Sequence, residues 1–305
     1  MDMALWATFT MWLVMTIRVA TPLIYTALGG MIGQKAGVFN FALEGSMLLG
    51  AFFAYIGSSS LGSPWFGLVF AILAGLFVGL IYAFTSVHLA VSQMVIGLGI
   101  NILALGITGY FYRLLDTSVV APMFGVWHVP LLSRIPFVGE VFFSHTGMVY
   151  VAVLLVFLFF VFLHRTTLGL EMRSVGENPR AADSLGISVF RYRYVATMIS
   201  CGLAATGGAF LTLTQVSRFL ENMIEGRGWI ALAAIILGKY EPKGILLACL
   251  LFGGAEALAM QLQILGIAVP YQALQMIPYA LTMVVLGGVV GRIKGPAALA
   301  KPFIK

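Results

Sequence analysis

Long apolar stretches alternate with short polar ones along the whole chain. The apolar stretches cover residues 4–33, 42–57, 65–87, 92–113, 147–164, 190–214, 229–238, 243–263 and 271–290. A helix needs about 20 apolar residues to cross the hydrocarbon core of a bilayer, and most of these stretches approach that length. The pattern predicts an all-α polytopic bundle of about 8–9 membrane segments. We expect it to form one transmembrane domain over residues 1–305.

Two stretches do not suit an ordinary membrane-spanning helix. Residues 34–41 and 229–238 are too short or too rich in glycine. Irregular backbone at membrane depth is tolerated only where it is buried in protein or lines a cavity. We therefore predict broken or re-entrant helices at both places. The regions 37–54 and 226–244 also share a faint similarity, because in each a short polar segment flanked by glycine precedes an apolar run. Internal repeats of this kind are common in transporters.

The composition agrees with a membrane protein. Hydrophobic residues make up 61% of the chain and charged residues 9%, with a mean hydropathy of +1.02. A soluble domain carries about 25% charged residues. Cys201 and Cys249 lie in apolar stretches, which predicts buried thiols rather than a disulfide scaffold. The N-terminus lacks the order of a cleaved signal peptide, so we expect it to be retained.

Lysine and arginine are unevenly distributed between the two predicted sides of the membrane. If the segments alternate, one side carries only Arg113, Arg134, Arg218 and Arg227. The other side carries Lys35, Arg165, Arg173, Arg180, Arg191, Arg193, Lys239, Lys243, Arg292, Lys294, Lys301 and Lys305. Because cytoplasmic loops hold the excess of basic residues, the second side and the C-terminus are predicted to be cytoplasmic. This bias accounts for the net charge of +6 without a nucleic-acid partner.

The longest polar stretch, about residues 114–146, is then external. It contains Pro122, Pro130 and Pro136 together with glycines and aromatic residues. This composition predicts an ordered external loop or short helix rather than a linker. Two roles remain open for it: it receives an external partner, or it caps the bundle.

A short charged island at about residues 172–187 separates two long apolar segments. Asn178 is a good N-cap, Pro179 suits the first helical position, and Gly186 suits the end of a short helix. A polar helix at the membrane surface has little packing reason to exist unless a soluble partner docks on it. The alternative is an ordinary cytoplasmic loop. The predicted helix would present Arg180, Asp183 and Ser184.

Several motifs resemble those of the membrane-spanning permease subunits of bacterial ABC importers, in the branch that handles simple sugars, nucleosides and related solutes. The resembling residues are 37–45, 100–106, 176–182, 185–187 and 226–233, within a match that runs from about Thr21 to Leu286. The resemblance implies a permease in a bacterial inner membrane, with an ATP-binding-cassette ATPase subunit, an extracytoplasmic solute-binding protein and a second, homologous permease as partners. It also implies a nucleoside or simple sugar as solute, with riboflavin-like vitamins remaining open.

In this family the island is the coupling helix, which seats in a groove of the ATPase subunit. The resemblance therefore assigns ATPase coupling to Gly176, Glu177, Asn178, Pro179, Arg180, Ala181, Ala182, Asp183 and Gly186.

Polar side chains within the apolar segments are candidates for the solute pathway. Asn40 and Glu44 lie four residues apart and would share one face of a helix. Gln93 and Asn101 lie near one face of a later segment, and Glu256 is the deepest acidic residue. Each has two interpretations: it lines the pathway, or it makes a structural hydrogen bond or ion pair between helices.

Four charged residues, Arg218, Glu221, Glu225 and Arg227, gather at the external ends of two segments. They form either a local set of salt bridges or part of the surface that receives the solute-binding protein.

The chain lacks the sequence signatures of enzymes. It contains no G-x-x-x-x-G-K-[S/T] loop for nucleotide phosphates, no metal-ligand spacing and no nucleophile–base motif. We therefore expect no metal, no cofactor and no catalytic residue, and a partner must supply the energy of ATP. Two rivals remain. An ion-coupled secondary carrier would depend on Glu256, and a membrane enzyme would need a catalytic cluster.

Overall fold

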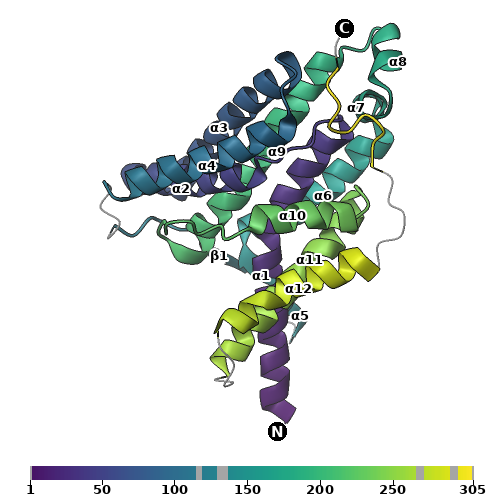
Figure 1. The fold of residues 1–305 in the computed structure, drawn as a ribbon. Coiled ribbons are helices and arrows are strands. Elements are labelled where there is room, and N and C mark those ends of the chain that lie inside the picture. Colours follow the sequence, from purple (N-terminus) through teal and green to yellow (C-terminus); the bar gives the residue numbers. More distant parts are fainter. Residues whose placement is uncertain (1, 115–118, 129–136, 266–270, 289–294, 304–305) are drawn as a thin grey trace.

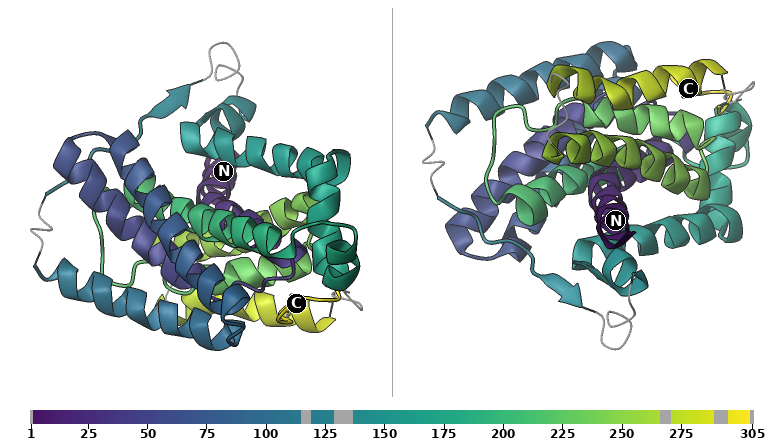
Figure 2. Two further views of the ribbon diagram at one scale, coloured as in Figure 1. Left: turned by 90° about the horizontal axis from the view of Figure 1, so that it is seen from above. Right: turned by 90° about the horizontal axis from the view of Figure 1, so that it is seen from below.

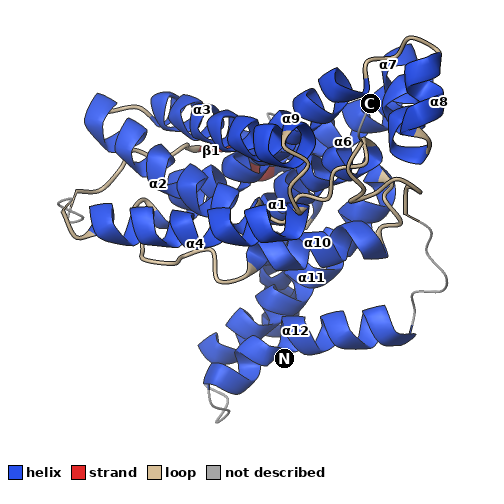
Figure 3. Cartoon of the chain, turned by 45° about the horizontal axis from the view of Figure 1, so that its top comes forward, coloured by secondary structure: helices blue, strands red, loops and turns tan. Residues whose placement is uncertain are grey.

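The computed structural model describes residues 2–114, 119–128, 137–265, 271–288 and 295–303. Most of this part of the chain is helical (Figures 1 and 3). The helices are α1 Asp2–Lys35, α2 Leu43–Leu61, α3 Pro64–Ala83, α4 Gln93–Tyr112, α5 Val138–Phe143, α6 Gly147–Arg165, α7 Thr167–Glu177, α8 Pro179–Ser184, α9 Val189–Phe210, α10 Arg227–Leu237, α11 Pro242–Ile264 and α12 Tyr271–Gly288. Two π-helical turns, η1 Phe84–His88 and η3 Leu211–Val216, extend α3 and α9.

Among the described residues, six helices are long and apolar enough to cross a membrane. They are Thr8–Lys35, Pro64–His88, Gln93–Tyr112, Gly147–Arg165, Val189–Val216 and Pro242–Ile264. The polytopic helical class is therefore confirmed, whereas the expected number of about 8–9 segments is not. One of the missing segments is α10, an apolar helix of only 11 residues, as predicted for residues 229–238.

Helix α9 lies at the centre of the bundle and packs against α1, α2 and α3. Its backbone touches that of α2, because a Cβ atom on Gly208 would lie 1.8 Å from the carbonyl oxygen of Met47. A Cβ atom on Gly50 would likewise lie 2.2 Å from the carbonyl oxygen of Ala205. Small residues thus permit the close approach that packing between membrane helices requires. Figure 2 shows α2–α4 on one side of the long helix α1 and α6–α8 on the other.

The predicted external loop at 114–146 contains more structure than a loop. Strands β1 Val126–His128 and β2 Ser144–Thr146 pair antiparallel, and α5 precedes β2. The hydroxyl of Ser58 donates to the carbonyl of Pro122 at 2.8 Å, which ties this region to α2. The all-α class is therefore modified by one short two-stranded antiparallel sheet. Pro130 and Pro136 lie outside the described residues.

Helices α7 and α8 lie at the opposite end of the molecule from the N-terminus (Figure 1). In Figure 1, α7 and α8 lie at the top beside the C-terminal end, and the N-terminus lies at the bottom. Cys201 and Cys249 are free and buried within the bundle, as predicted.

Candidate functional site

The charged island folds as a bent pair of short helices, α7 and α8, which we call the elbow (residues 167–186). The side chain of Asn178 accepts a hydrogen bond from the backbone N–H of Ala181 at 3.1 Å and so caps α8. Pro179 is the first residue of α8, and Gly186 takes φ +82° just beyond its end. The predicted short helix and its start and stop residues are thus present.

One side of the elbow is buried and the other is exposed. Val175, Gly176 and Ala182 are buried, and Val175 and Ala182 pack with Val189 and Phe303 in a small apolar cluster. The exposed residues are Thr167, Leu168, Leu170, Glu177, Asn178, Arg180, Ala181, Ser184, Leu185 and Gly186, with Asp183 half-buried. Leu185 is 80% exposed. Leu185 is among the resembling residues but was not assigned to ATPase coupling, although an apolar residue next to the stop glycine of a polar helix was a signal for it.

The C-terminal residues 295–303, which we call the strap, bind the elbow to the rest of the bundle. The backbone N–H of Ala298 donates to the carbonyl of Gly176 at 3.0 Å, and that of Ala300 donates to the carbonyl of Gly37 at 3.1 Å. These contacts join the end of α7 to the turn that follows α1. Nothing in the sequence pattern predicted them.

Two further contacts hold the elbow in place. A Cβ atom on Gly176 would lie 2.1 Å from the carbonyl oxygen of Lys35, so the end of α7 rests directly on the end of α1. The guanidinium of Arg193, on α9, is 1% exposed and donates from Nη1 to the carbonyl of Lys301 at 2.9 Å. The elbow is therefore connected to both α1 and the central helix.

Asn40 and Gln93 hold the irregular segment between α1 and α2. The amide of Asn40 donates to the hydroxyl of Ser200 on α9 at 2.9 Å. The side-chain oxygen of Gln93 accepts a hydrogen bond from the backbone N–H of Phe39 at 2.8 Å. Both side chains are buried. Each has a structural partner, and a role in lining the pathway stays a prediction.

Asn101 makes a comparable pair of contacts with the start of α2. Its Oδ1 atom accepts from the backbone N–H of Gly45 at 2.8 Å, and its Nδ2 atom donates to the carbonyl of Phe41 at 3.0 Å. One amide thus satisfies two backbone groups where the helix begins. For Asn101 as well, exposure to the solute stays a prediction.

Glu44 connects α2 to the first turn of α10. Its carboxylate accepts hydrogen bonds from the backbone N–H groups of Gly226 at 2.8 Å and Gly228 at 2.7 Å. A carboxylate at a helix N-terminus satisfies otherwise unpaired donors and interacts favourably with the helix dipole. Lys35 is not the partner of Glu44, because its ammonium lies 3.0 Å from a carboxylate oxygen of Glu241. The two regions with faint sequence similarity therefore meet at this contact.

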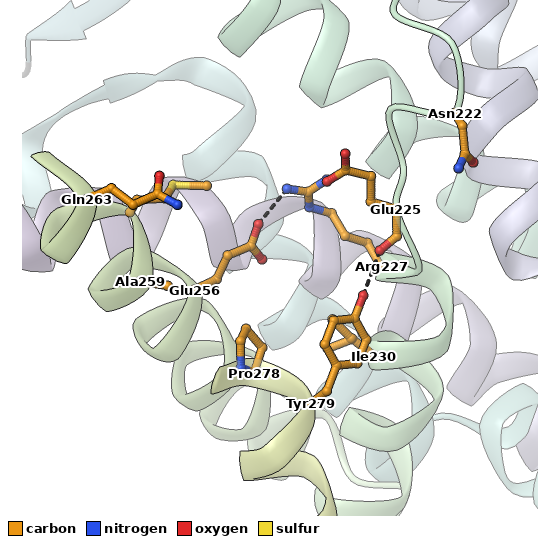
Figure 4. A pocket seen from close by; sticks show the side chains of 10 residues that line it. Asn222, Glu225, Arg227, Ile230, Glu256, Ala259, Gln263, Pro278 and Tyr279 are labelled. Atoms are coloured by element: carbon orange, nitrogen blue, oxygen red, sulfur yellow. Dashed lines mark hydrogen bonds and ion pairs between the residues drawn. The ribbon is translucent and has the colours of Figure 1, made fainter. Parts of the chain in front are cut away.

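A polar pocket lies beside the start of α10, and Figure 4 shows it from close by. It has a volume of about 410 Å³ and lies between α10, α11, α12 and the loop before α10. Its lining residues are Asn222, Glu225, Arg227, Ile230, Glu256, Ala259, Met260, Gln263, Pro278 and Tyr279. We call it the α10–α12 pocket.

Three of the six charged and polar side chains that line the α10–α12 pocket have partners within the described residues. Arg227 Nη2 lies 2.5 Å from Glu256 Oε1, and the two side chains are 14% and 15% exposed. The hydroxyl of Tyr279 donates to the carbonyl of Glu225 at 2.8 Å. Arg227 neutralises Glu256, the deepest acid, and the exposed Glu225 is the one charged lining residue without an ion-pair partner among the described residues.

The four charged residues before α10 do not form a local salt-bridge set. Within the described residues, no ion pair joins two of them. Arg227 instead pairs with Glu256, and Glu221 lies 4.0 Å from Arg113 at an exposed position. Arg218 and Glu225 are also exposed. Arg227 begins α10 and pairs with Glu256 of α11, so the expected pairing among the four is not found within the described residues.

Comparison with known proteins agrees with the resemblance seen in the motifs. A family model described as "Branched-chain amino acid transport system / permease component" matches residues 12–290. The guanosine ABC transporter permease protein NupQ of Bacillus subtilis is 38% identical over 95% of both chains. The nucleoside ABC transporter permease protein NupC of Lactococcus lactis is 37% identical over 94% of both chains.

A third relative is the putative glucose ABC transporter permease protein TsgC13 of Haloferax volcanii, 35% identical over 83% of this chain and 78% of its own. Bacillus subtilis also has a second guanosine ABC transporter permease protein, NupP, which is 28% identical over 82% of this chain. Lactococcus lactis has a second nucleoside ABC transporter permease protein, NupB, which is 25% identical over 78% of this chain. No solved structure matches the chain. The family match and these identities show that the chain belongs to the family of transport-system permease components.

Proposed function

We propose that this chain is one permease subunit of an ABC importer that brings nucleosides into the cell. The elbow carries the proposal, because α8 is capped, stands at one end of a membrane bundle and exposes Arg180 and Leu185. This surface suits docking of an ATPase subunit. The sequence has no phosphate-binding loop of its own, so the partner would bind and hydrolyse ATP.

Movement of the ATPase subunits would reach the bundle through the contacts of the elbow. Gly176 rests on the end of α1, and the strap joins the elbow to the buried Arg193 of α9. Packed backbones transmit displacement because they cannot be compressed. A push on α8 would therefore move α1 and α9 together rather than bend a free loop.

The α10–α12 pocket supports an uncharged polar solute. Its volume of about 410 Å³ lies within the range of small-molecule sites, about 300–1,000 Å³. Asn222 and Gln263 offer amide groups, while Met260 and Pro278 offer apolar contact for a flat base. Glu256 is already paired with Arg227, which disfavours the ion-coupled carrier, since such a carrier needs an acid free to bind a cation.

The remaining partners follow from the relatives and from the charge distribution. Two guanosine permeases in one bacterium and two nucleoside permeases in another support a second permease that is homologous but not identical. The excess of lysine and arginine supports a cytoplasmic elbow and C-terminus. Arg218, Glu221 and Glu225 would then face the solute-binding protein outside.

Affinity purification from native membranes in gentle detergent tests the docking surface. We expect an ATPase subunit and a second permease to co-purify with the wild-type chain. Replacing Glu177, Arg180 and Asp183 by alanine, or Leu185→Ser alone, should remove the ATPase but retain the second permease. Arg191→Ala, an exposed change outside the elbow, is the matched control.

Uptake by the complete transporter in proteoliposomes tests the solute. We expect ATP-dependent uptake of labelled guanosine that unlabelled glucose does not reduce. Competition by glucose but not by guanosine would favour the sugar alternative. Uptake that follows a proton gradient without ATP would refute the importer.

A further inference from the structure

A second, smaller pocket lies at the base of the elbow. Its volume is about 240 Å³. The lining residues are Lys35, Arg173, Glu177, Lys239, Tyr240 and Pro296. We call it the basal pocket. It brings together the end of α1, the elbow, the turn between α10 and α11, and the strap.

The basal pocket has an excess of positive charge. Lys35 is paired with Glu241, but within the described residues Arg173 and Lys239 have no carboxylate at ion-pair distance. The Nε atom of Arg173 is buried without a hydrogen-bond partner. Unpaired cations at a concave surface attract anions, and a buried donor without an acceptor is costly.

The one carboxylate in the lining is already engaged. Glu177 Oε2 accepts a hydrogen bond from the backbone N–H of Ala297, in the strap, at 3.2 Å. This contact holds the carboxylate against the strap, and the three cationic side chains of the lining, Lys35, Arg173 and Lys239, outnumber it. Burial raises the pKa of Tyr240, so its hydroxyl stays protonated and can donate a further hydrogen bond.

The turn that carries Lys239 is held in a defined conformation. Lys239 and Tyr240 take φ +55° and +59°, and their N–H groups bind the carbonyls of Ile236 and Ile235 at 2.9 and 3.0 Å. A Cβ atom on Gly238 would lie 2.4 Å from the backbone nitrogen of Ile245, so the turn packs tightly on α11. These contacts fix the position of the backbone that carries Lys239 and Tyr240 at the wall of the basal pocket.

We propose that the basal pocket binds a phosphate group. A phosphate offers several charged acceptor oxygens, which match an arginine, a lysine and a hydroxyl donor around one cavity. The group belongs either to an anionic phospholipid headgroup or to a soluble phosphorylated compound. Either occupant touches the elbow through Arg173 and lies against Pro296 of the strap, and so holds the strap on the elbow.

The test uses the complete transporter purified in gentle detergent. In one arm, native mass spectrometry measures how much phosphatidylglycerol remains bound, compared with phosphatidylcholine. In the other arm, equilibrium binding is measured with inorganic phosphate and with a nucleoside monophosphate. The variants are Lys239→Gln, a change at an exposed side chain, and Arg173→Gln with Lys239→Gln. Arg191→Gln removes an exposed cation outside the pocket and is the control.

We expect wild type and Arg191→Gln to bind one of these probes, and the double variant to bind it at least about tenfold more weakly, as loss of a hydrogen bond to a charged group implies. Loss confined to phosphatidylglycerol identifies a lipid, and loss confined to the soluble probes identifies a metabolite. The proposal is overturned if the wild-type protein binds neither class, or if Lys239→Gln and the double variant bind as the wild type does.

Discussion

Arg227, the first residue of α10, forms an ion pair of 2.5 Å with Glu256 past the middle of α11. The pair lies in the wall of the α10–α12 pocket and faces Gln263 and Tyr279 (Figure 4). It thus joins the short helix α10 to the long helix α11 at the proposed solute site. The same two residues hold the helices together and determine the charge of the pocket.

Removing one partner of this pair should destabilise the protein. Glu256→Gln leaves the guanidinium of Arg227 largely buried without its counter-charge, and we expect a loss of about 3 kcal/mol. The thermal midpoint of unfolding in detergent measures this loss. Replacing both Arg227 and Glu256 by methionine should restore the midpoint while ATP-dependent uptake stays low. Unchanged stability of Glu256→Gln would show that the pair contributes little.

Glu44 should matter through the start of α10. Its carboxylate accepts two backbone hydrogen bonds, from Gly226 and Gly228, so Glu44→Ala should cost about 2 kcal/mol or more. Glu44→Gln retains one acceptor oxygen and should cost less. Hydrogen exchange of the α10 amides would localise the effect. Glu221→Ala, at an exposed position, is the control and should change stability by less than about 0.5 kcal/mol.

Gly176→Ala should disturb coupling. The added methyl group would lie 2.1 Å from the carbonyl oxygen of Lys35, so the elbow must move away from α1. We expect the rate of ATP-dependent uptake to fall at least about tenfold, which corresponds to an increase of about 1.4 kcal/mol in the activation free energy of transport. The ATPase activity of the purified complex should persist.

The control for Gly176→Ala is Gly99→Ala in α4, where an added Cβ atom meets nothing within 4 Å. Alanine is favoured over glycine inside a helix, so this variant should be as stable as the wild type or slightly more stable. Full uptake by Gly176→Ala would mean that close contact between the elbow and α1 is not needed.

The strap should stabilise the elbow locally. Phe303 is 7% exposed and packs with Val175, Ala182 and Val189, so Phe303→Ala removes a large part of the small core under α8. Large-to-small changes of buried phenylalanine cost about 3–5 kcal/mol. We expect faster hydrogen exchange across residues 167–186, with little change in α3 or α4. Equal acceleration in all helices would instead indicate global destabilisation.

Much of the elbow could be predicted because its signals are local. Helix α8 is capped by Asn178, begins at Pro179 and is stopped by Gly186 just beyond its end. Each of these roles depends only on the conformation of residues close by in the sequence. The strap could not be predicted, since its hydrogen bonds to the rest of the chain join residues more than a hundred positions apart.

For the polar side chains of the membrane segments, too, contacts with residues distant in the sequence could not be predicted. The sequence places Asn40, Glu44, Asn101 and Glu256 in apolar surroundings, where the cost of burial demands a partner. It does not identify that partner, and Lys35 and Glu44 bind different groups in the structure. Their partners became visible only once the helices were packed.

The sequence by itself determined that this protein is a helical membrane protein with a short polar helix between two apolar segments, because hydropathy and helix capping act over a few consecutive residues. Its motifs, rather than its hydropathy, carried the resemblance to permease subunits. The tertiary structure decided which charges pair, where the pockets lie and how the strap holds the elbow. Those features depend on the distances between helices, and in a membrane such distances are set by close packing of small side chains rather than by local preference.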